Sequence, residues 1–546
     1  MPAIPLALSK TKQDQHFQRE VILDQAAWRC PLLLIVMLGA SGRVYGLGEL
    51  SLWFDECFCW KMSTYPLSEQ WERAAGDNHP PLFYFFLKLW TLLMGHSPAA
   101  VRLFSVFAGI VTILGAFLLV REIETDVFQC SKNDARSIKP ALFAAVLIAL
   151  SPFQIEWAQT VRMYALGAAL SVWSTWALLR ALTAPVPRIR DWILYALLAA
   201  GLIYTHYFGF FILAAHGIYG GFRILRVLKD RRKTSSEKKK LILLAFLAVC
   251  LVGFLWFPWN NEFLLQRQRG LEQKWGRPQG LDYFTRSVSE MFGLMWNPAS
   301  AEMARARIVT ILFLFLTLAA FILGRKSERL LGLIVITSFG FALLLGSGSK
   351  SLIASWYFLF AHVFFLCAIS VLLFRIPSRW FSRIILSVVL IGAGWQFTQQ
   401  LYWRASRIND PSFQAAVNYV EALRKNGEII FVNGPRDYVA VSPYLPDCKS
   451  MYVLSDEWDF VFGTGTAVVE RQKHLTPASV SELNESRAWI IFATNKSMNP
   501  AGVAMPKDWI DVTEERFNDW RYGQIVVRQY EHIRTADNAI EQQSQL

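Results

Sequence analysis

Residues 101–120, VRLFSVFAGIVTILGAFLLV, form an apolar run with a single charged side chain, Arg102. A helix that crosses the hydrocarbon core of a bilayer needs roughly 20 such residues. The whole chain is similarly apolar, because 54% of its 546 residues are hydrophobic and only 18% are charged. A soluble globular chain usually carries about 25% charged residues. The composition therefore predicts a multi-span membrane protein, and it excludes a disordered chain, a collagen-like chain and a small disulfide scaffold.

Ten further stretches resemble residues 101–120, so the sequence predicts a polytopic α-helical membrane protein with about eleven transmembrane helices. The predicted spans are residues 31–48, 101–120, 140–155, 163–183, 191–205, 207–222, 241–258, 306–324, 330–347, 352–374 and 384–402. Residues 82–95 are also apolar, but the segment is short, and it predicts a helix that lies in the membrane interface.

The basic residues predict the orientation of these spans. Lys and Arg gather in breaks that are separated by two spans each, so all of these breaks fall on one side of the membrane, which the positive-inside rule makes the cytoplasm. They are the N-terminal tail 1–29 and residues 121–139, 180–190, 223–240, 325–329 and 375–383. The tail is polar, so we expect a cytoplasmic N-terminus without a cleavable signal peptide in a multi-pass protein of the inner (plasma) membrane. External loops 49–100 and 259–305 and the short break 151–162 then face the opposite side.

The sequence changes character after the transmembrane domain, residues 30–403. An amphipathic helical pattern at 412–427 is followed by β-like runs at 428–432, 487–495 and 525–530. Alternating helix and strand patterns predict a small extracytoplasmic α/β domain over residues 404–535. Residues 536–546 are expected to form a flexible tail.

The net charge of +13 does not indicate nucleic-acid binding, because the basic residues occupy topological breaks and no nucleic-acid module is recognisable. The seven cysteines are scattered along the chain, and we interpret them as structural.

Two adjacent acids, Asp55 and Glu56, follow the first predicted span in the stretch SLWFDECFCW, residues 51–60. The neighbouring Trp53 and Phe54 place them at the membrane interface, where partial desolvation raises the basicity of a carboxylate. Such a group could take a proton from an acceptor hydroxyl. The alternative is an ordinary acidic outer loop.

Asp77 and His79 precede two prolines in the same loop. They are candidate ligands of a divalent metal ion, the one cofactor that the sequence raises, or candidate partners of a substrate hydroxyl. The alternative is a polar turn capped by Asp77.

Arginine and aromatic residues recur at the outer ends of later spans. Arg162 is suited to phosphate, although an arginine that only anchors its helix end is the alternative, and Tyr164 could border the same cavity. His206 lies in a short external turn, where a histidine is more often structural than catalytic. The loop 259–305 carries Arg267 among several cations, which could rest on anionic headgroups or form salt bridges in solvent.

The order of these motifs resembles that of the bacterial membrane glycosyltransferases of the GT-C superfamily, in the group similar to protein O-mannosyltransferases and aminoarabinose transferases. The matching pieces are W-x-D-E at Trp53–Glu56, D-x-H-P-P-L-x-Y from Asp77, Q-x-x-R-M-Y-A-L from Gln159, and T-H-Y at Thr205–Tyr207. The resemblance covers roughly residues 30–400.

The resemblance implies transfer of a sugar from a polyprenyl-phosphate donor to an extracytoplasmic glycan, lipid or protein, with membrane lipids as further partners. It implies that Asp55 is the general base, that Glu56 assists it, and that Arg162 contacts the donor phosphate. Relatives often have Q-E-x-R where this chain has Thr160, and an R-Y pair where it has Trp356–Tyr357. Lys350 is a candidate substitute for the missing arginine.

Two other functions remain open from the sequence. A transporter of lipid-linked glycan would carry charged residues in mid-span, whereas spans 306–324 and 352–374 have almost none besides His362. A catalytically inactive scaffold that binds glycan lipid is favoured by Thr160 and Trp356, and Asp55, Glu56 and Arg162 argue against it.

Overall fold

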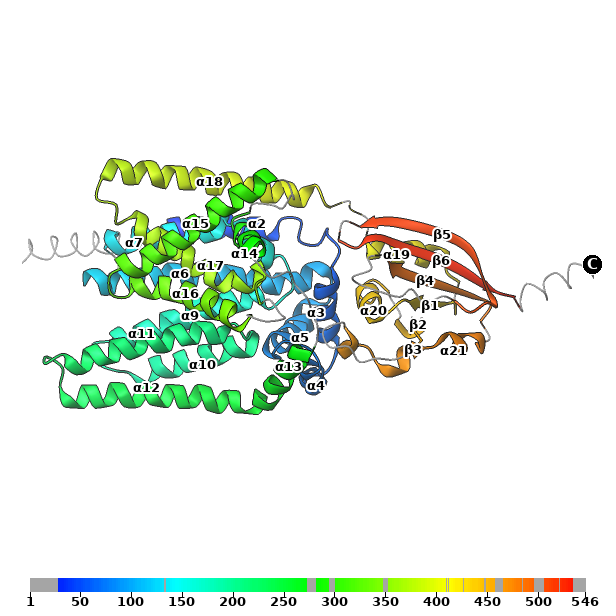
Figure 1. Ribbon diagram of the computed structural model, residues 1–546, viewed down its shortest axis with the longest axis horizontal. Coiled ribbons are helices and arrows are strands. Elements are labelled where there is room, and N and C mark those ends of the chain that lie inside the picture. The colour runs from blue at the N-terminus through cyan, green and yellow to red at the C-terminus, as the bar shows by residue number, and fades with distance from the viewer. Residues whose placement is uncertain are drawn as a thin grey trace, which may run out of the picture.

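The computed structural model describes residues 28–533 apart from 132–133, 273–280, 294–299, 347–351, 409, 411, 426, 446–447, 457–464, 484, 495–504 and 520. The described chain has two parts. A long helical bundle carries a sheet domain at one end (Figure 1).

Each predicted span coincides with a helix of the bundle. These helices are α2 (Arg29–Val44), α6 (Pro98–Phe128), α7 (Ala135–Leu150), α9 (Tyr164–Thr183), α10 (Ile189–Thr205), α11 (Gly209–Lys229), α12 (Ser235–Trp256), α15 (Ser300–Leu323), α16 (Glu328–Leu345), α17 (Leu359–Leu373) and α18 (Arg379–Ala405).

The structure confirms a multi-pass membrane protein but not the count of eleven spans. Among the described helices, eight are long and apolar enough to cross a membrane, or nine if the bent pair of α7 and α8 (Pro152–Ala158) forms one span. Helix α2 has 16 residues and α10 has 17, so both are shorter than the roughly 20 residues of a typical span.

Short helices fill the space between the bundle and the sheet domain. Helices α3 (Phe54–Thr64), α4 (Leu67–Ala75), α5 (Leu82–Met94) and α13 (Asn260–Glu272) gather there (Figure 1). The external segments predicted as loops therefore contain helices, and α14 (Leu281–Glu290) adds another. The 13 residues of α5 extend about 20 Å, which is shorter than the hydrocarbon core.

The basic breaks meet at the opposite end of the bundle (Figure 1). Arg223 lies 3.2 Å from Asp126, and the ammonium of Lys326 donates to the Asp126 carbonyl at 3.1 Å. Arg375 pairs with Glu124 at 2.8 Å. Breaks 121–139, 223–240, 325–329 and 375–383 thus share one end, which is the arrangement predicted from the spacing of the basic residues.

The C-terminal domain is built on one six-stranded sheet with the order β3-β2-β1-β4-β6-β5. Strands β1 (Ile429–Val432), β2 (Met451–Leu454), β3 (His474–Leu475) and β4 (Arg487–Ala493) run parallel, and β5 (Trp509–Asp519) and β6 (Gly523–His532) form an antiparallel hairpin at its edge. Its helices are α19 (Phe413–Leu423), α20 (Pro435–Val441) and α21 (Pro477–Ser481). The predicted α/β domain is confirmed as a mixed sheet with helices.

A close approach inside the bundle depends on a glycine. A Cβ at Gly167 on α9 would lie 2.4 Å from the ring of Phe360 on α17. We predict that Gly167→Ala lowers the free energy of unfolding by about 1–3 kcal/mol, because Phe360 must leave its packed position. Gly217→Ala on α11 is the control, since nothing lies within 4 Å of its Cβ position. Unfolding in detergent, followed by tryptophan fluorescence, measures both variants, and equal stability would contradict this packing.

Candidate active site

The C-terminal domain holds the segment that leads into α3. The Leu52 amide donates to the Tyr444 hydroxyl at 2.5 Å, and the Phe54 amide donates to the Tyr522 hydroxyl at 2.5 Å. The guanidinium of Arg521 lies 4.6 Å from the centre of the Trp53 ring. Contacts from the sheet domain therefore help to fix the position of the backbone that leads to Asp55.

Glu56 forms a buried ion pair with Arg102 at the start of α6. Both carboxylate oxygens accept from this guanidinium, at 2.8 and 2.6 Å, and the Val161 amide donates to one of them at 3.0 Å. Arg102 also donates to the carbonyls of Leu47, Leu50 and Ser51. One charge pair thus joins α3, α6, the end of the first span and the turn that precedes α9.

This pair also sets the protonation state of Glu56. Burial by itself would raise the pKa of the carboxyl group, but the charge and hydrogen bonds of Arg102 and the Val161 amide lower the pKa below its usual value. Glu56 is therefore ionised at neutral pH, and both of its oxygens are occupied.

Asp55, next to Glu56 in the sequence, lies beside Arg162. Its Oδ2 lies 4.0 Å from Nε of Arg162, and its side chain is 30% exposed, whereas that of Arg162 is 6% exposed. The Arg162 Nε has no hydrogen-bond partner among the described residues, and its Nη1 contacts the Cys59 sulfur at 3.6 Å. Burial raises the pKa of the Cys59 thiol to about 12, so this sulfur does not neutralise the arginine.

Two buried histidines lie beside this pair. Nδ1 of His79 is 3.4 Å from Oδ2 of Asp77, which also accepts from the Tyr84 hydroxyl at 3.2 Å. The rings of His79 and His206 are 5.6 Å apart, and burial lowers the pKa of both. Both rings are therefore neutral at neutral pH, whereas Arg162 supplies a fixed positive charge beside them.

Aromatic rings lie next to His206 and Arg162. The His206 ring lies 5.7 Å from Tyr164 and 5.4 Å from Tyr357, and the Arg162 guanidinium lies 5.9 Å from the Tyr164 ring. Tyr357 follows Trp356 in the short 3-10 helix η2 (Ser355–Phe358). The resulting set, which we call the Asp55–Arg162 cluster, comprises Asp55, Asp77, His79, Arg162, Tyr164, His206 and Tyr357.

The structure thus brings together most of the predicted site residues, which come from turns far apart in the sequence. Arg267 lies apart from them, exposed on α13. Lys350 lies outside the described residues. No group of three His, Cys, Asp or Glu side chains in the described part of the chain could hold a metal ion. Asp77 and His79 alone provide two ligands.

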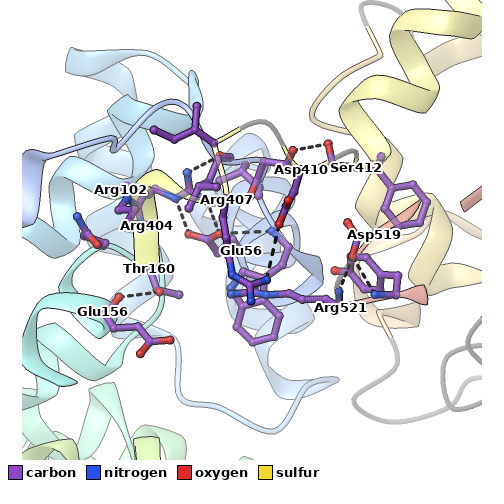
Figure 2. Close-up of a pocket in the computed structure, with 18 of the residues that line it drawn as sticks. Glu56, Arg102, Glu156, Thr160, Arg404, Arg407, Asp410, Ser412, Asp519 and Arg521 are labelled. Atoms are coloured by element: carbon purple, nitrogen blue, oxygen red, sulfur yellow. Dashed lines mark hydrogen bonds and ion pairs between the residues drawn. The ribbon is translucent and has the colours of Figure 1, made fainter. Parts of the chain in front are cut away.

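A polar cavity lined by Glu56 lies between the bundle and the sheet domain (Figure 2). Its volume is about 60 Å³. Residues of α3, α8, the end of α18 and the β5–β6 turn line it, among them Glu56, Glu156, Thr160, Arg404, Arg407 and Arg521. The cavity lining and the Asp55–Arg162 cluster therefore have no residue in common.

The sequence did not predict the role of Arg102. Arg102 is the single charge in the apolar stretch 101–120, and a charge within a span is itself a functional signal. Tyr357 was named only as the tyrosine of the R-Y position, and its contact with His206 could not be predicted because it depends on the packing of η2.

The chain matches the family model of dolichyl-phosphate-mannose-protein mannosyltransferases over residues 78–256. No curated protein matches it in sequence. The matched residues contain the turns that carry His79, Arg162 and His206.

The fold is similar to that of solved membrane glycosyltransferases. ArnT from Cupriavidus metallidurans, solved with undecaprenyl phosphate, aligns with a TM-score of 0.57 at 14% identity, over 92% of this chain and 98% of that one. The apo state of ArnT aligns equally, with 13% identity. The archaeal oligosaccharyltransferase AglB from Archaeoglobus fulgidus aligns with a TM-score of 0.49 at 9% identity, over 87% of this chain and 70% of that one. The predicted resemblance to the GT-C glycosyltransferases is confirmed at the level of the fold.

The Arg102–Glu56 pair predicts a strong and pH-dependent effect on stability. Glu56→Gln should lower the free energy of unfolding by about 3–5 kcal/mol, because Arg102 stays buried without a charged partner. The depressed pKa of Glu56 means that this stabilisation is present above its unfolded value of 4.5 and is lost as the pH falls through the folded pKa.

Unfolding in detergent at a series of pH values measures this effect. The difference in free energy of unfolding between wild type and Glu56→Gln should become smaller below pH 4.5. Asp282→Asn is the control, since its side chain is 63% exposed and its partner Arg307 is also exposed, so this change should leave stability nearly unchanged. Equal stability of the two variants would contradict a structural role for the buried pair.

Proposed function

We propose that this protein is a membrane glycosyltransferase that moves a sugar from a polyprenyl-phosphate donor to an acceptor, with Asp55 as the general base. The observation that carries the proposal is the placement of Asp55 4.0 Å from the buried Arg162, at one end of a GT-C fold. The partly exposed carboxylate is available to an acceptor, and the guanidinium is available to a phosphate.

The donor class follows from the charge of the site and from a structural neighbour. A guanidinium is a planar donor array with permanent charge, which suits a phosphate group. ArnT, which has the same fold, was solved with undecaprenyl phosphate bound. We therefore assign the donor phosphate of this chain to Arg162, with Tyr164 and the neutral rings of His79 and His206 as further contacts.

The reaction balances with these groups. An acceptor hydroxyl oxygen attacks the anomeric carbon, the bond from this carbon to the phosphate oxygen breaks, and the electron pair leaves with polyprenyl phosphate. Asp55 takes the hydroxyl proton, and Arg162 stabilises the charge that develops on the leaving phosphate. The leaving group departs as an anion, so a general acid is not required.

Glu56 takes a different part in this proposal. Its oxygens are occupied by Arg102 and the Val161 amide, so it does not assist as a second base. We assign it a positioning role, because it fixes the first turn of α3 to the turn that carries Arg162.

The proposed orientation places the site outside the cytoplasm. The basic breaks meet at one end of the bundle, and the Asp55–Arg162 cluster and the sheet domain lie at the other (Figure 1). Under the positive-inside rule, the basic end is cytoplasmic. Transfer then takes place on the extracytoplasmic face, with the N-terminus in the cytoplasm.

Asp55→Asn tests the base directly. We expect the transfer rate to fall about 10²–10⁴-fold, because the amide cannot accept the proton. Purified wild type and variant would receive radiolabelled polyprenyl-phosphate sugars, with total membrane extract as the source of acceptor. Asp282→Asn, whose side chain is 63% exposed on α14, is the control and should retain wild-type transfer.

Either of two results would contradict this assignment. Full activity of Asp55→Asn would exclude Asp55 as the base. Failure of wild type to transfer any donor sugar, with polyprenyl-phosphate binding intact, would favour the inactive scaffold. Thr160→Glu and Trp356→Arg would then test whether those two departures from the relatives' motifs explain the absence of transfer.

Arg162→Gln separates donor binding from proton transfer. We expect the dissociation constant of undecaprenyl phosphate to rise at least about tenfold, since a charge-assisted contact to phosphate is lost. Binding by Asp55→Asn should not weaken, because that change removes a negative charge. Scintillation proximity with tritiated undecaprenyl phosphate gives both values, and unchanged binding by Arg162→Gln would contradict the donor assignment.

A further inference from the structure

The cavity at the boundary of the two parts is separate from the Asp55–Arg162 cluster but shares its framework. Glu56, which lines the cavity, follows Asp55 on α3, and Thr160, which also lines it, precedes Arg162 by two residues. Arg404 and Arg407 reach the cavity from the end of α18, and Arg521 reaches it from the β5–β6 turn (Figure 2).

Three of the four carboxylates that line this cavity are occupied, and the fourth is that of Glu156. Glu56 pairs with Arg102, and Asp410 lies 3.6 Å from Arg407. Oδ1 of Asp519 accepts from the backbone amides of Arg521 and Tyr522, at 2.7 and 2.8 Å. Asp519 therefore caps its own turn with this oxygen.

Two of the arginines have neutral groups among their contacts. The Arg404 guanidinium donates to the Gly46 carbonyl at 3.2 and 3.0 Å, and that of Arg521 covers the Trp53 ring. Burial lowers the pKa of Arg521 despite the nearby carboxylates of Glu56 and Glu156. The surroundings thus compensate the positive charge of Arg521 only in part, and a bound anion would add to that compensation.

The size of the cavity limits the group that it can hold. Its volume of about 60 Å³ is well below the roughly 150 Å³ of a cavity that binds benzene. A whole sugar ring is too large, whereas a compact anion fits. Guanidinium groups from two elements match the oxygens of phosphate, which several donors can contact at once.

We propose that this cavity is an anion subsite that binds a phosphate group of the acceptor substrate through Arg407 and Arg521. The inference rests on the proposed function, because it places the acceptor beside Asp55. An acceptor whose phosphate is anchored in this cavity would present its hydroxyl to the neighbouring Asp55, while Arg162 holds the donor phosphate.

Phosphate binding tests the subsite without any need for transfer. The full chain in phosphatidylcholine nanodiscs would first be saturated with undecaprenyl phosphate, which fills the donor site. Inorganic phosphate is then titrated at constant ionic strength, and its dissociation constant is taken from the rise in Tm. A second arm replaces inorganic phosphate with nanodiscs that contain phosphatidic acid, so that soluble and lipid-borne phosphate are distinguished.

We expect saturable stabilisation of the wild type in at least one arm. Arg407→Gln and Arg521→Gln should each raise the dissociation constant about tenfold or more. Arg516→Gln, on the same hairpin and 51% exposed, is the matched control and should bind like wild type. Arg407 lies at the end of α18 with a quarter of its side chain exposed, so its variant should fold even if Arg521→Gln does not.

The remaining outcomes are decisive. Absence of saturable stabilisation in both arms, or equal phosphate binding by wild type and Arg407→Gln, would overturn the subsite. In a transfer assay, Arg407→Gln should raise KM for the acceptor and leave KM for the donor unchanged. Phosphate binding that depends on Arg407, in a protein that transfers no sugar, would refute the proposed function but leave the anion site standing.

Discussion

The buried ion pair between Arg102 and Glu56 is the constraint on which the rest of the site depends. A charge pair this far from solvent is costly to form, and it persists here because every oxygen of Glu56 and most donors of Arg102 find partners. Those partners belong to four segments that are distant in sequence. Since Asp55 and Arg162 lie next to members of this network, their separation is set by the pair and not by local sequence.

The C-terminal domain completes this framework. Tyr444, Tyr522 and Arg521 contact residues 52–54 directly, so the sheet domain is part of the site and not a separate appendage. Its β5–β6 turn also forms one wall of the polar cavity. Under the proposed function, the donor binds at the Asp55–Arg162 cluster and the acceptor at the cavity, with Asp55 as the general base.

The sequence could predict the fold class and much of the site, because both depend on strong signals. Apolar runs and basic breaks predicted the helical bundle. The candidate site residues were found as polar residues at the ends of predicted helices, namely Asp55, His79, Arg162 and His206. Strand β5 was missed, since its sequence WIDVTEERFND is highly charged and its side chains are largely exposed at the sheet edge. The role of Glu56 could not be predicted either, because its partner Arg102 is 46 residues away and belongs to an apolar span. The cavity arginines were likewise brought together only by tertiary packing.

The most direct test of this account is a structure of the protein with undecaprenyl phosphate, determined by electron cryo-microscopy in nanodiscs. The account predicts phosphate density against the Arg162 guanidinium, bordered by His79, His206 and Tyr164, with Asp55 open to the acceptor side. Phosphate density at the opposite end of the bundle, near Arg223 and Lys326, would contradict the assignment of the site and of the reaction that it is proposed to catalyse.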